Sequence, residues 1–486
     1  MGIVRRQSFL NSISFYFGMV IGAINTVIIY PNAFKDNPEY FGLIQILLAY
    51  SIVIATFTTI GIPKIFIRYF PAIKHKGQLF FLSLITPLLG FVLALTTYLL
   101  FKSQIFEILN ASNLLKENFF YIILLVFFIG FYEVLTAISR SFLSASTPVF
   151  INEVFLKLYS ILMLSLYWFN FFDFPFFLKI YLFGYVLKFI ILLFIQHRNK
   201  RISFTLSFKN LDLVDIFKYG FFVLLGGVSV LIVTRIDMMM LASLLDLEQV
   251  AYYTVAFFIG NAIMVPSKSI SAISLPLISQ ACEKNEIDKI QSLYSKSSIN
   301  QLIIGGLFFI CVWLNIDDIF SLLPEKFSVG KYVVLYIGIS QLFNMASGLN
   351  GEIIINSKFY RYDLYSNIFL VFLTIATNYY FIQKFGIEGA AMATAISILI
   401  FNLTRLIILK INLNIQPFTV KTLYTILLLV ILYITINKLP SLSFPLVNII
   451  YKSFVAIIIF TPSLYLLNLS EDITSFLNEL RSKYFS

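Results

Sequence analysis

Residues 119–139 read FFYIILLVFFIGFYEVLTAIS, an apolar run that is interrupted by a single charge, Glu133. An α-helix rises about 1.5 Å per residue, so about 20 such residues cross the hydrocarbon core of a bilayer. The stretch therefore predicts a membrane-spanning helix, and the remaining sequence repeats this pattern many times.

The composition of the whole chain has the same character. Of the 486 residues, 59% are hydrophobic and 12% are charged, and the mean hydropathy is +0.90. A soluble domain has about 45–50% apolar and about 25% charged residues, so no soluble interior could bury this much apolar surface. We expect an all-α integral membrane protein with about fourteen transmembrane helices. The spans are expected near 8–29, 41–62, 79–101, 119–139, 148–170, 174–195, 217–240, 250–275, 298–315, 332–354, 364–383, 387–408, 419–437 and 444–468.

The net charge of +11 lies mostly in short loops between the apolar runs. A basic chain can indicate nucleic-acid binding, but the distribution of the charges follows the positive-inside rule instead. One set of alternate loops holds most of the cations, among them Arg5, Arg6, Lys64, Arg68 and Arg198. This bias predicts that both termini are cytoplasmic, and we expect the bilayer but no nucleic acid as a partner.

No motif for catalysis, metal or cofactor binding is found in the sequence. Cys282 lies in a polar loop and Cys311 in an apolar run, while His75 and His197 lie in basic loops, so no metal-ligand spacing exists. We expect no metal, no cofactor and no enzymatic activity.

The most polar internal stretch, 196–216, follows six expected spans and precedes eight. Each half then contains an acidic-aromatic entry, an apolar run and a proline, as in EYFGLIQILLAY from Glu39 and EQVAYYTVAFFI from Glu248. An even number of helices per repeat gives both repeats the same orientation in the membrane. The predicted organisation is two pseudo-symmetric six-helix lobes and two further helices: 1–200 (spans 1–6), 201–412 (spans 7–12), 413–470 (spans 13–14) and a cytoplasmic tail, 471–486.

Polar residues recur at helical spacing within several spans, which places them on one face of each helix. The residues that we select as candidates for substrate binding are Asn25, Glu133, Arg140, Arg235, Asp237, Asn261, Lys268, Asn344, Glu352 and Asn356.

Two interpretations of these faces remain open. Charges within a membrane are costly and usually line a cavity or meet a partner. Alternatively, small and polar residues hold helices together, and basic residues near span ends, such as Lys188 and Arg405, extend to the interface. In GIEGAAMATAIS (386–397), the residues Gly389, Ala393 and Ser397 predict close helix packing.

Four stretches together resemble the polysaccharide and O-antigen flippases (polysaccharide biosynthesis proteins) of the multidrug/oligosaccharidyl-lipid/polysaccharide exporter superfamily. They are EYFGLIQILLAYSIVIATFTTIGIPKIFIRYFP (39–71), RIDMMMLASLLDLEQVAYYTVAFFIGNAI (235–263), SLPLIS (274–279) and FGIEGAAMATAIS (385–397). The resemblance covers most of the chain through about residue 410.

This resemblance implies transport of undecaprenyl-diphosphate-linked oligosaccharide from the cytoplasmic to the outer leaflet of a bacterial inner membrane, by alternating access. It also implies two six-helix lobes around a central cavity, two extra helices, and energy from an ion gradient or the membrane potential. A coupling proton or sodium ion and polysaccharide assembly proteins are further expected partners. Asp237 is carried over only as a position of the family motif.

Two related functions remain as alternatives. Lipid II flippases have several arginines in their cavity helices, whereas spans 1 and 2 here have no basic residue after Arg6. Multidrug exporters of the superfamily have twelve spans, so the two last helices argue mildly against this function. A membrane polymerase would need a large outer loop, which the sequence lacks, and a scaffold would leave the intramembrane charges unexplained.

Overall fold

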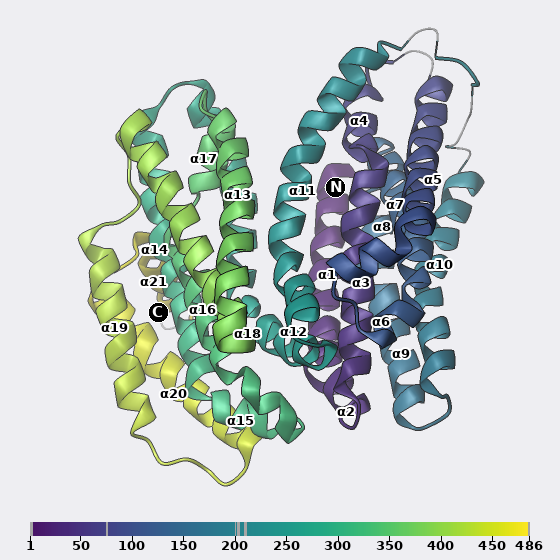
Figure 1. The fold of residues 1–486 in the computed structure, drawn as a ribbon. Helices are drawn as coiled ribbons and strands as arrows, with labels where there is room; N and C mark the ends of the chain where they lie inside the picture. The colour runs from purple at the N-terminus through teal and green to yellow at the C-terminus, as the bar shows by residue number, and fades with distance from the viewer. Residues whose placement is uncertain (1–2, 74–75, 200, 202–204, 209–210, 485–486) are drawn as a thin grey trace. The chain divides into compact units, whose positions relative to one another are not determined.

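The computed structural model describes residues 3–73, 76–199, 201, 205–208 and 211–484. Every regular element within these residues is a helix (Figure 1), which confirms the all-α membrane fold. Eleven helices are long and apolar enough to cross a membrane, or up to 13 if each of two bent pairs is one span. The expected number of fourteen stays a prediction. His75 and part of the polar stretch 196–216 lie outside the described residues.

The chain divides into two compact units, Met1–Thr254 and Val255–Ser486. The boundary between the units lies within α12 (Leu247–Asn261). Helix α11 (Leu213–Leu244) therefore packs with the first unit, mainly against α3. The predicted lobes, which divide near residue 200, were derived from the internal repeat and not from packing contacts. They stay a prediction.

Unit 1 begins with a span that is made of three pieces. These are α1 (Ile3–Ala23), a π-helical turn (Ile24–Ile29) and α2 (Tyr30–Ala33). A second π-helical turn, Ile151–Phe155, separates α8 (Ser146–Phe150) from α9 (Leu156–Trp168). The other helices of the unit are α3 (Pro38–Thr59), α4 (Ile62–Tyr69), α5 (Lys76–Ile108), α6 (Asn113–Asn118), α7 (Phe120–Ser141), α10 (Phe174–Arg198) and α11.

Unit 2 is also helical throughout its described residues. A 3-10 turn, Ala262–Met264, interrupts the helical path between α12 and α13 (Val265–Glu283), and another, Glu325–Gly330, precedes α16. The tail forms α21 (Glu471–Tyr484). The other helices are α14 (Ile287–Leu314), α15 (Ile316–Ser321), α16 (Lys331–Ala346), α17 (Asn350–Asn356), α18 (Arg361–Leu413), α19 (Val420–Asn437) and α20 (Pro445–Leu466).

Helix α18 is a hairpin that contains two of the expected spans, 364–383 and 387–408. Its helical path breaks at Gly386, where φ is 58° and ψ is −134°. A Cβ on Gly389 would lie 2.0 Å from the carbonyl oxygen of Phe381, and the hydroxyls of Thr377 and Ser397 are 3.0 Å apart. Residues this far apart along one straight helix could not touch, so the two halves lie against each other. The packing that was predicted for 386–397 is confirmed.

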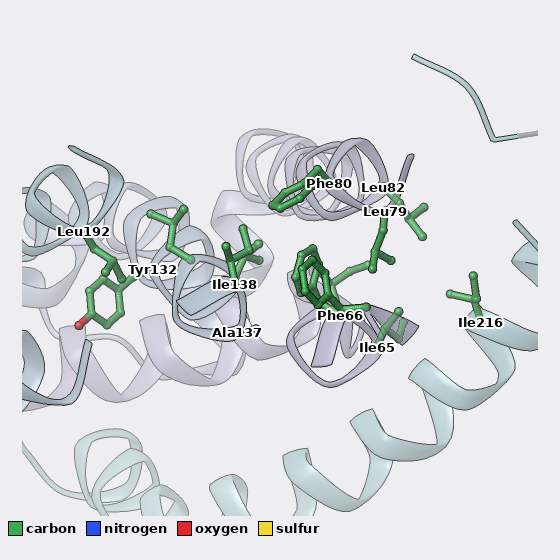
Figure 2. Packing of buried hydrophobic residues seen from close by; sticks show 14 of the residues in the cluster. Ile65, Phe66, Leu79, Phe80, Leu82, Tyr132, Ala137, Ile138, Leu192 and Ile216 are labelled. Carbon is green, nitrogen blue, oxygen red and sulfur yellow. The ribbon is translucent and has the colours of Figure 1, made fainter. Parts of the chain in front are cut away.

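Unit 1 has a buried apolar cluster where α4 meets α5, α7 and α11 (Figure 2). Ile65 and Phe66 of α4, Leu79 of α5 and Ile216 of α11 are each 2% exposed or less. A Cβ on Gly61 would lie 2.5 Å from the carbonyl oxygen of Gly220, so α11 approaches the start of α4 at backbone distance. This packing explains why α11 belongs to unit 1.

We expect Gly386→Ala to destabilise the protein by about 1–3 kcal/mol, because a residue with a Cβ strongly disfavours this backbone conformation. The measurement is thermal unfolding of the purified protein in detergent. Gly227→Ala is the matched control, since a Cβ there meets nothing within 4 Å in the interior of α11. A melting temperature of Gly386→Ala that equals that of the control would contradict the hairpin.

Candidate functional site

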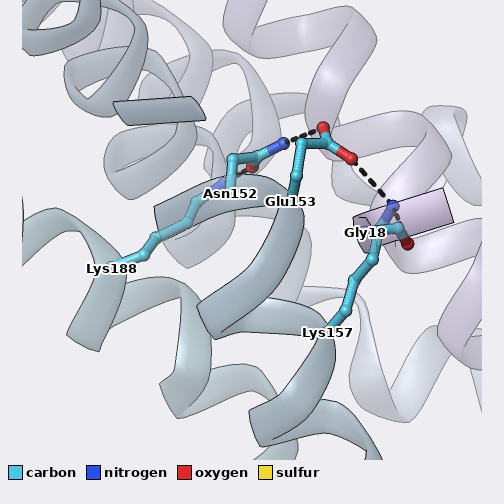
Figure 3. Close-up of polar contacts among 5 residues, drawn as sticks. All are labelled: Gly18, Asn152, Glu153, Lys157 and Lys188. Atoms are coloured by element: carbon cyan, nitrogen blue, oxygen red, sulfur yellow. Dashed lines mark hydrogen bonds and ion pairs between the residues drawn. The ribbon is translucent and has the colours of Figure 1, made fainter. Parts of the chain in front are cut away.

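A chain of polar contacts links three spans of unit 1 (Figure 3). The Lys188 Nζ donates to Asn152 Oδ1 at 3.1 Å, and Asn152 Nδ2 donates to Glu153 Oε1 at 3.0 Å. The other carboxylate oxygen of Glu153 accepts from Lys157 Nζ at 2.8 Å, and Lys157 Nζ also donates to the Gly18 carbonyl at 3.0 Å. We call these five residues the unit 1 polar row.

The π-helical turn Ile151–Phe155 positions the middle of this row. Such turns widen the helix by one residue and are frequent at functional sites. Asn152 accepts a hydrogen bond from Lys188 of α10. Glu153 pairs with Lys157, whose ammonium also donates to the Gly18 carbonyl of α1. The turn thus contributes polar groups to the contacts with both α10 and α1.

Lys188 is the most buried cation of the row, with 5% of the residue exposed. Its ammonium lies 4.4 Å from the ring centroid of Tyr132 and 4.9 Å from that of Tyr185. Cation–π contacts of this kind stabilise a desolvated ammonium. Arg235 also acts electrostatically on Tyr185.

Unit 2 has its own ionic site, between the two halves of α18. The guanidinium of Arg405 pairs with the carboxylate of Asp363, and the two side chains are 13% and 19% exposed. The Arg405 guanidinium lies 4.1 Å from the ring centroid of Phe401, and the Glu352 carboxylate also acts on its charge. A Cβ on Gly351 would lie 2.6 Å from an Arg405 nitrogen, so glycine leaves room for the guanidinium.

An amide network extends from this ion pair along α16. Asn350 Nδ2 donates to Asn402 Oδ1 at 2.9 Å, and Asn402 Nδ2 donates to Asn344 Oδ1 at 3.1 Å. Gln341 Nε2 donates to Asn261 Oδ1 at 3.1 Å. Of the predicted residues, Asn261, Asn344 and Glu352 are therefore gathered on connected helices of one unit.

The predicted residues of spans 1 and 4 have different surroundings. Asn25 is buried and donates to Ser160 Oγ at 2.9 Å, which is a helix-packing contact with α9. Glu133 and Arg140 are exposed on α7, whereas Thr136 between them is buried. Glu133 acts electrostatically on Lys188 of the unit 1 polar row, so this predicted residue is near that row.

Asp237 lies in a buried contact rather than on an open face. It is 4% exposed, and its Oδ2 accepts from the Tyr253 hydroxyl at 2.6 Å, which joins α11 to α12. Arg235 is half-buried two residues away, and Lys268 is exposed. Asn356 donates to the Glu352 carbonyl of its own helix at 2.8 Å. None of these contacts tests substrate binding, which stays a prediction for all ten residues.

Sequence reasoning missed Asn152, Glu153 and Lys157, and it treated Lys188 and Arg405 as residues that could extend to the interface. The Glu153–Lys157 spacing of four was a visible signal of an intrahelical pair. The spacing continues to Ser160, so span 5 also has a short polar face. Its partners come from other helices, which periodicity within one span does not identify.

These helices and polar networks define a class, the polytopic membrane proteins. The fold is similar to that of the lipid II flippase MurJ in an inward closed conformation, with TM-score 0.74, 16% identity, and coverage of 94% of this chain and 99% of that chain. It is also similar to an inward-facing multidrug resistance MATE family transporter of the MOP superfamily, with TM-score 0.64, 15% identity, and coverage of 82% and 94%. At these identities the likeness shows the fold alone.

The family model for polysaccharide biosynthesis proteins matches residues 5–282, and the MatE model matches residues 223–380. The chain therefore belongs to the polysaccharide biosynthesis protein family. A curated relative, the probable low-salt glycan biosynthesis flippase Agl15 of Haloferax volcanii, is 23% identical over 192 residues. That match spans 39% of this chain and 40% of the relative.

We expect Asp363→Asn to destabilise the protein by about 3 kcal/mol, because it leaves the Arg405 charge with less compensation in a poorly solvated site. The measurement is thermal unfolding, and the double variant Asp363→Asn/Arg405→Gln should recover part of the loss. Glu286→Gln is the control, since its pair with Lys289 is 51% and 39% exposed for the lysine and glutamate. Pairs of that kind contribute at most about 1 kcal/mol. Equal losses in the two single variants would contradict a structural role for the Asp363–Arg405 pair.

Proposed function

We propose that this protein moves undecaprenyl-diphosphate-linked oligosaccharide from the cytoplasmic to the outer leaflet of a bacterial inner membrane, for the assembly of a surface polysaccharide such as the O-antigen of lipopolysaccharide. The observation that carries the proposal is the polysaccharide biosynthesis family match over residues 5–282 on a transporter fold. The similarity to Agl15, a probable glycan biosynthesis flippase, also supports transport of a glycan.

The physical task explains why such a fold is needed. An oligosaccharide loses the hydration of its hydroxyls when it enters hydrocarbon, and each unsatisfied polar group costs several kcal/mol. A transporter replaces that hydration with polar side chains, while the polyprenyl tail stays in the bilayer. No bond is made or broken, so the protein needs no catalytic residue, and alternating access is sufficient for translocation.

The diphosphate requires cationic contacts. Arg140, Arg235 and Lys268 are the candidates from the sequence, and Lys188 joins them because of its coupling through Tyr185 to Arg235. A guanidinium suits phosphate because it presents several donors in a planar fork. Arg235 is the first of these to test, since it is half-buried within α11.

The distribution of basic residues among the loops bears on the topology of the protein. By the positive-inside rule it favours both termini in the cytoplasm. A coupling proton or sodium ion would find the carboxylate of Glu352 beside Arg405, and polysaccharide assembly proteins are the expected partners. A second candidate, export of small amphiphilic molecules, is favoured by the MatE match over residues 223–380.

Deletion of the gene tests the main proposal against the second. We expect lipid-linked oligosaccharide to accumulate on the cytoplasmic side and surface polysaccharide to be lost, with both reversed by the wild-type gene. The measurement is mass spectrometry of extracted lipid-linked glycans, with a membrane-impermeant reagent that labels the outer leaflet. Unchanged surface glycan together with raised drug sensitivity would instead support the exporter.

We expect Arg235→Gln to lower glycan transport roughly tenfold or more, because a hydrogen bond to a charged group contributes about 1.5–3 kcal/mol. Transport is measured by flipping of the lipid-linked glycan in proteoliposomes or by complementation of the deletion strain. Lys179→Gln is the matched control, since Lys179 is exposed on α10 of the same unit. If neutral variants at Arg140, Arg235, Lys268 and Lys188 all keep full transport, the diphosphate assignment is wrong.

A further inference from the structure

Lys157 occupies a small oxygen-lined slot between α9 and α1. Its ammonium is 2.8 Å from Glu153 Oε2 and 3.0 Å from the Gly18 carbonyl oxygen (Figure 3). One ligand is a carboxylate from the π-helical turn, and the other is a backbone carbonyl from the first span. The ammonium thus bridges two spans.

Two glycines of α1 make the slot. A Cβ on Gly18 would lie 2.5 Å from the Glu153 carbonyl oxygen, so only glycine lets α1 approach the π-helical turn. A Cβ on Gly22 would lie 3.4 Å from Lys157 Nζ, at the tight edge of ordinary contact. Gly18 and Gly22 are four residues apart on α1, and both lie against the α8–α9 span that carries Lys157.

The ligands of this slot are those that hard cations prefer. Carboxylate and carbonyl oxygens coordinate such ions, and water molecules commonly complete the coordination. The side chains of Lys157 and Glu153 are 31% and 23% exposed, so the pair is not sealed within the unit. Asn152 holds the second oxygen of Glu153 and fixes the carboxylate in place.

We propose that Lys157 is a built-in counter-ion, and that its ammonium fills a site which takes a free monovalent cation such as Na⁺ when the lysine is shortened. In the wild-type protein the Glu153 carboxylate is neutralised from within the chain and needs no ion from solution. Any coupling cation must then bind elsewhere. This inference concerns the cation chemistry of unit 1 and does not depend on which substrate the protein transports.

The experiment compares Lys157→Ala with the wild-type protein in thermal unfolding, in NaCl and in choline chloride of equal ionic strength. Binding of an ion to the folded state alone raises its stability by mass action. We expect the melting temperature of Lys157→Ala to rise saturably with Na⁺, by roughly 2 °C or more, and to stay flat in choline. The wild-type protein and Lys179→Ala should not distinguish the two salts.

The double variant Glu153→Gln/Lys157→Ala separates a specific site from a general salt effect, because it lacks the carboxylate that the ion would bind. It should lose the response to Na⁺. A flat response of Lys157→Ala, or an equal response in the wild-type protein or in the double variant, overturns the proposal.

A fluorescent-protein fusion in isolated membranes gives the same comparison if Lys157→Ala does not survive purification, with the fraction that remains soluble after heating as the readout. If Lys157→Ala does not accumulate in membranes, the proposal requires that Glu153→Gln/Lys157→Ala does, because the uncompensated carboxylate is then the defect. Failure of the double variant to accumulate would overturn the proposal as well.

Discussion

The organisation of each unit depends on one constraint: a charge or amide within an apolar helix finds no water and must be satisfied by a neighbouring helix. The unit 1 polar row meets this requirement with two ammonium groups, one carboxylate, one amide and one backbone carbonyl. Each of these contacts fixes the rotation of a helix about its axis. Apolar packing alone is not directional and would specify that rotation only weakly. Polar contacts thus position the helices, and glycines such as Gly18 set how closely the backbones approach.

The same connection occurs in both units. In unit 1, Lys188 of α10 donates to Asn152, which lies near the start of the preceding span. In unit 2, Arg405 in the second half of α18 pairs with Asp363, which lies near the start of the first half. In each case the base belongs to the sixth span of the expected repeat and its partner to the fifth. The likeness is what the internal repeat predicts, and it involves residues that played no part in detecting the repeat. A helical hairpin with its ends tied by a basic side chain is therefore the shared building unit.

Hydropathy was sufficient to predict the helices because each span satisfies its own backbone, so its signal is local in the sequence. Periodicity also predicted the packing face of Gly389 and Ser397, since the partner lies in the adjacent half of α18. Periodicity could not predict the contacts of Glu153 and Lys157. A polar stripe identifies the polar face of a helix, but it does not identify the distant helix that this face contacts. The same limit applies to Asp237. Its motif position was recognised, but its contact with Tyr253 depends on how α12 turns back onto α11.

The two units share a connection, and in each of them two carboxylates compensate the charge of one base. The base is Lys188 in unit 1 and Arg405 in unit 2, and the carboxylates that act on them are Glu133 and Glu153 in the first unit and Asp363 and Glu352 in the second. A base that lost such partners in a poorly solvated site would cost several kcal/mol. Both units therefore meet the same electrostatic requirement in the same way, which explains why the connection between neighbouring helices occurs in each half of the chain.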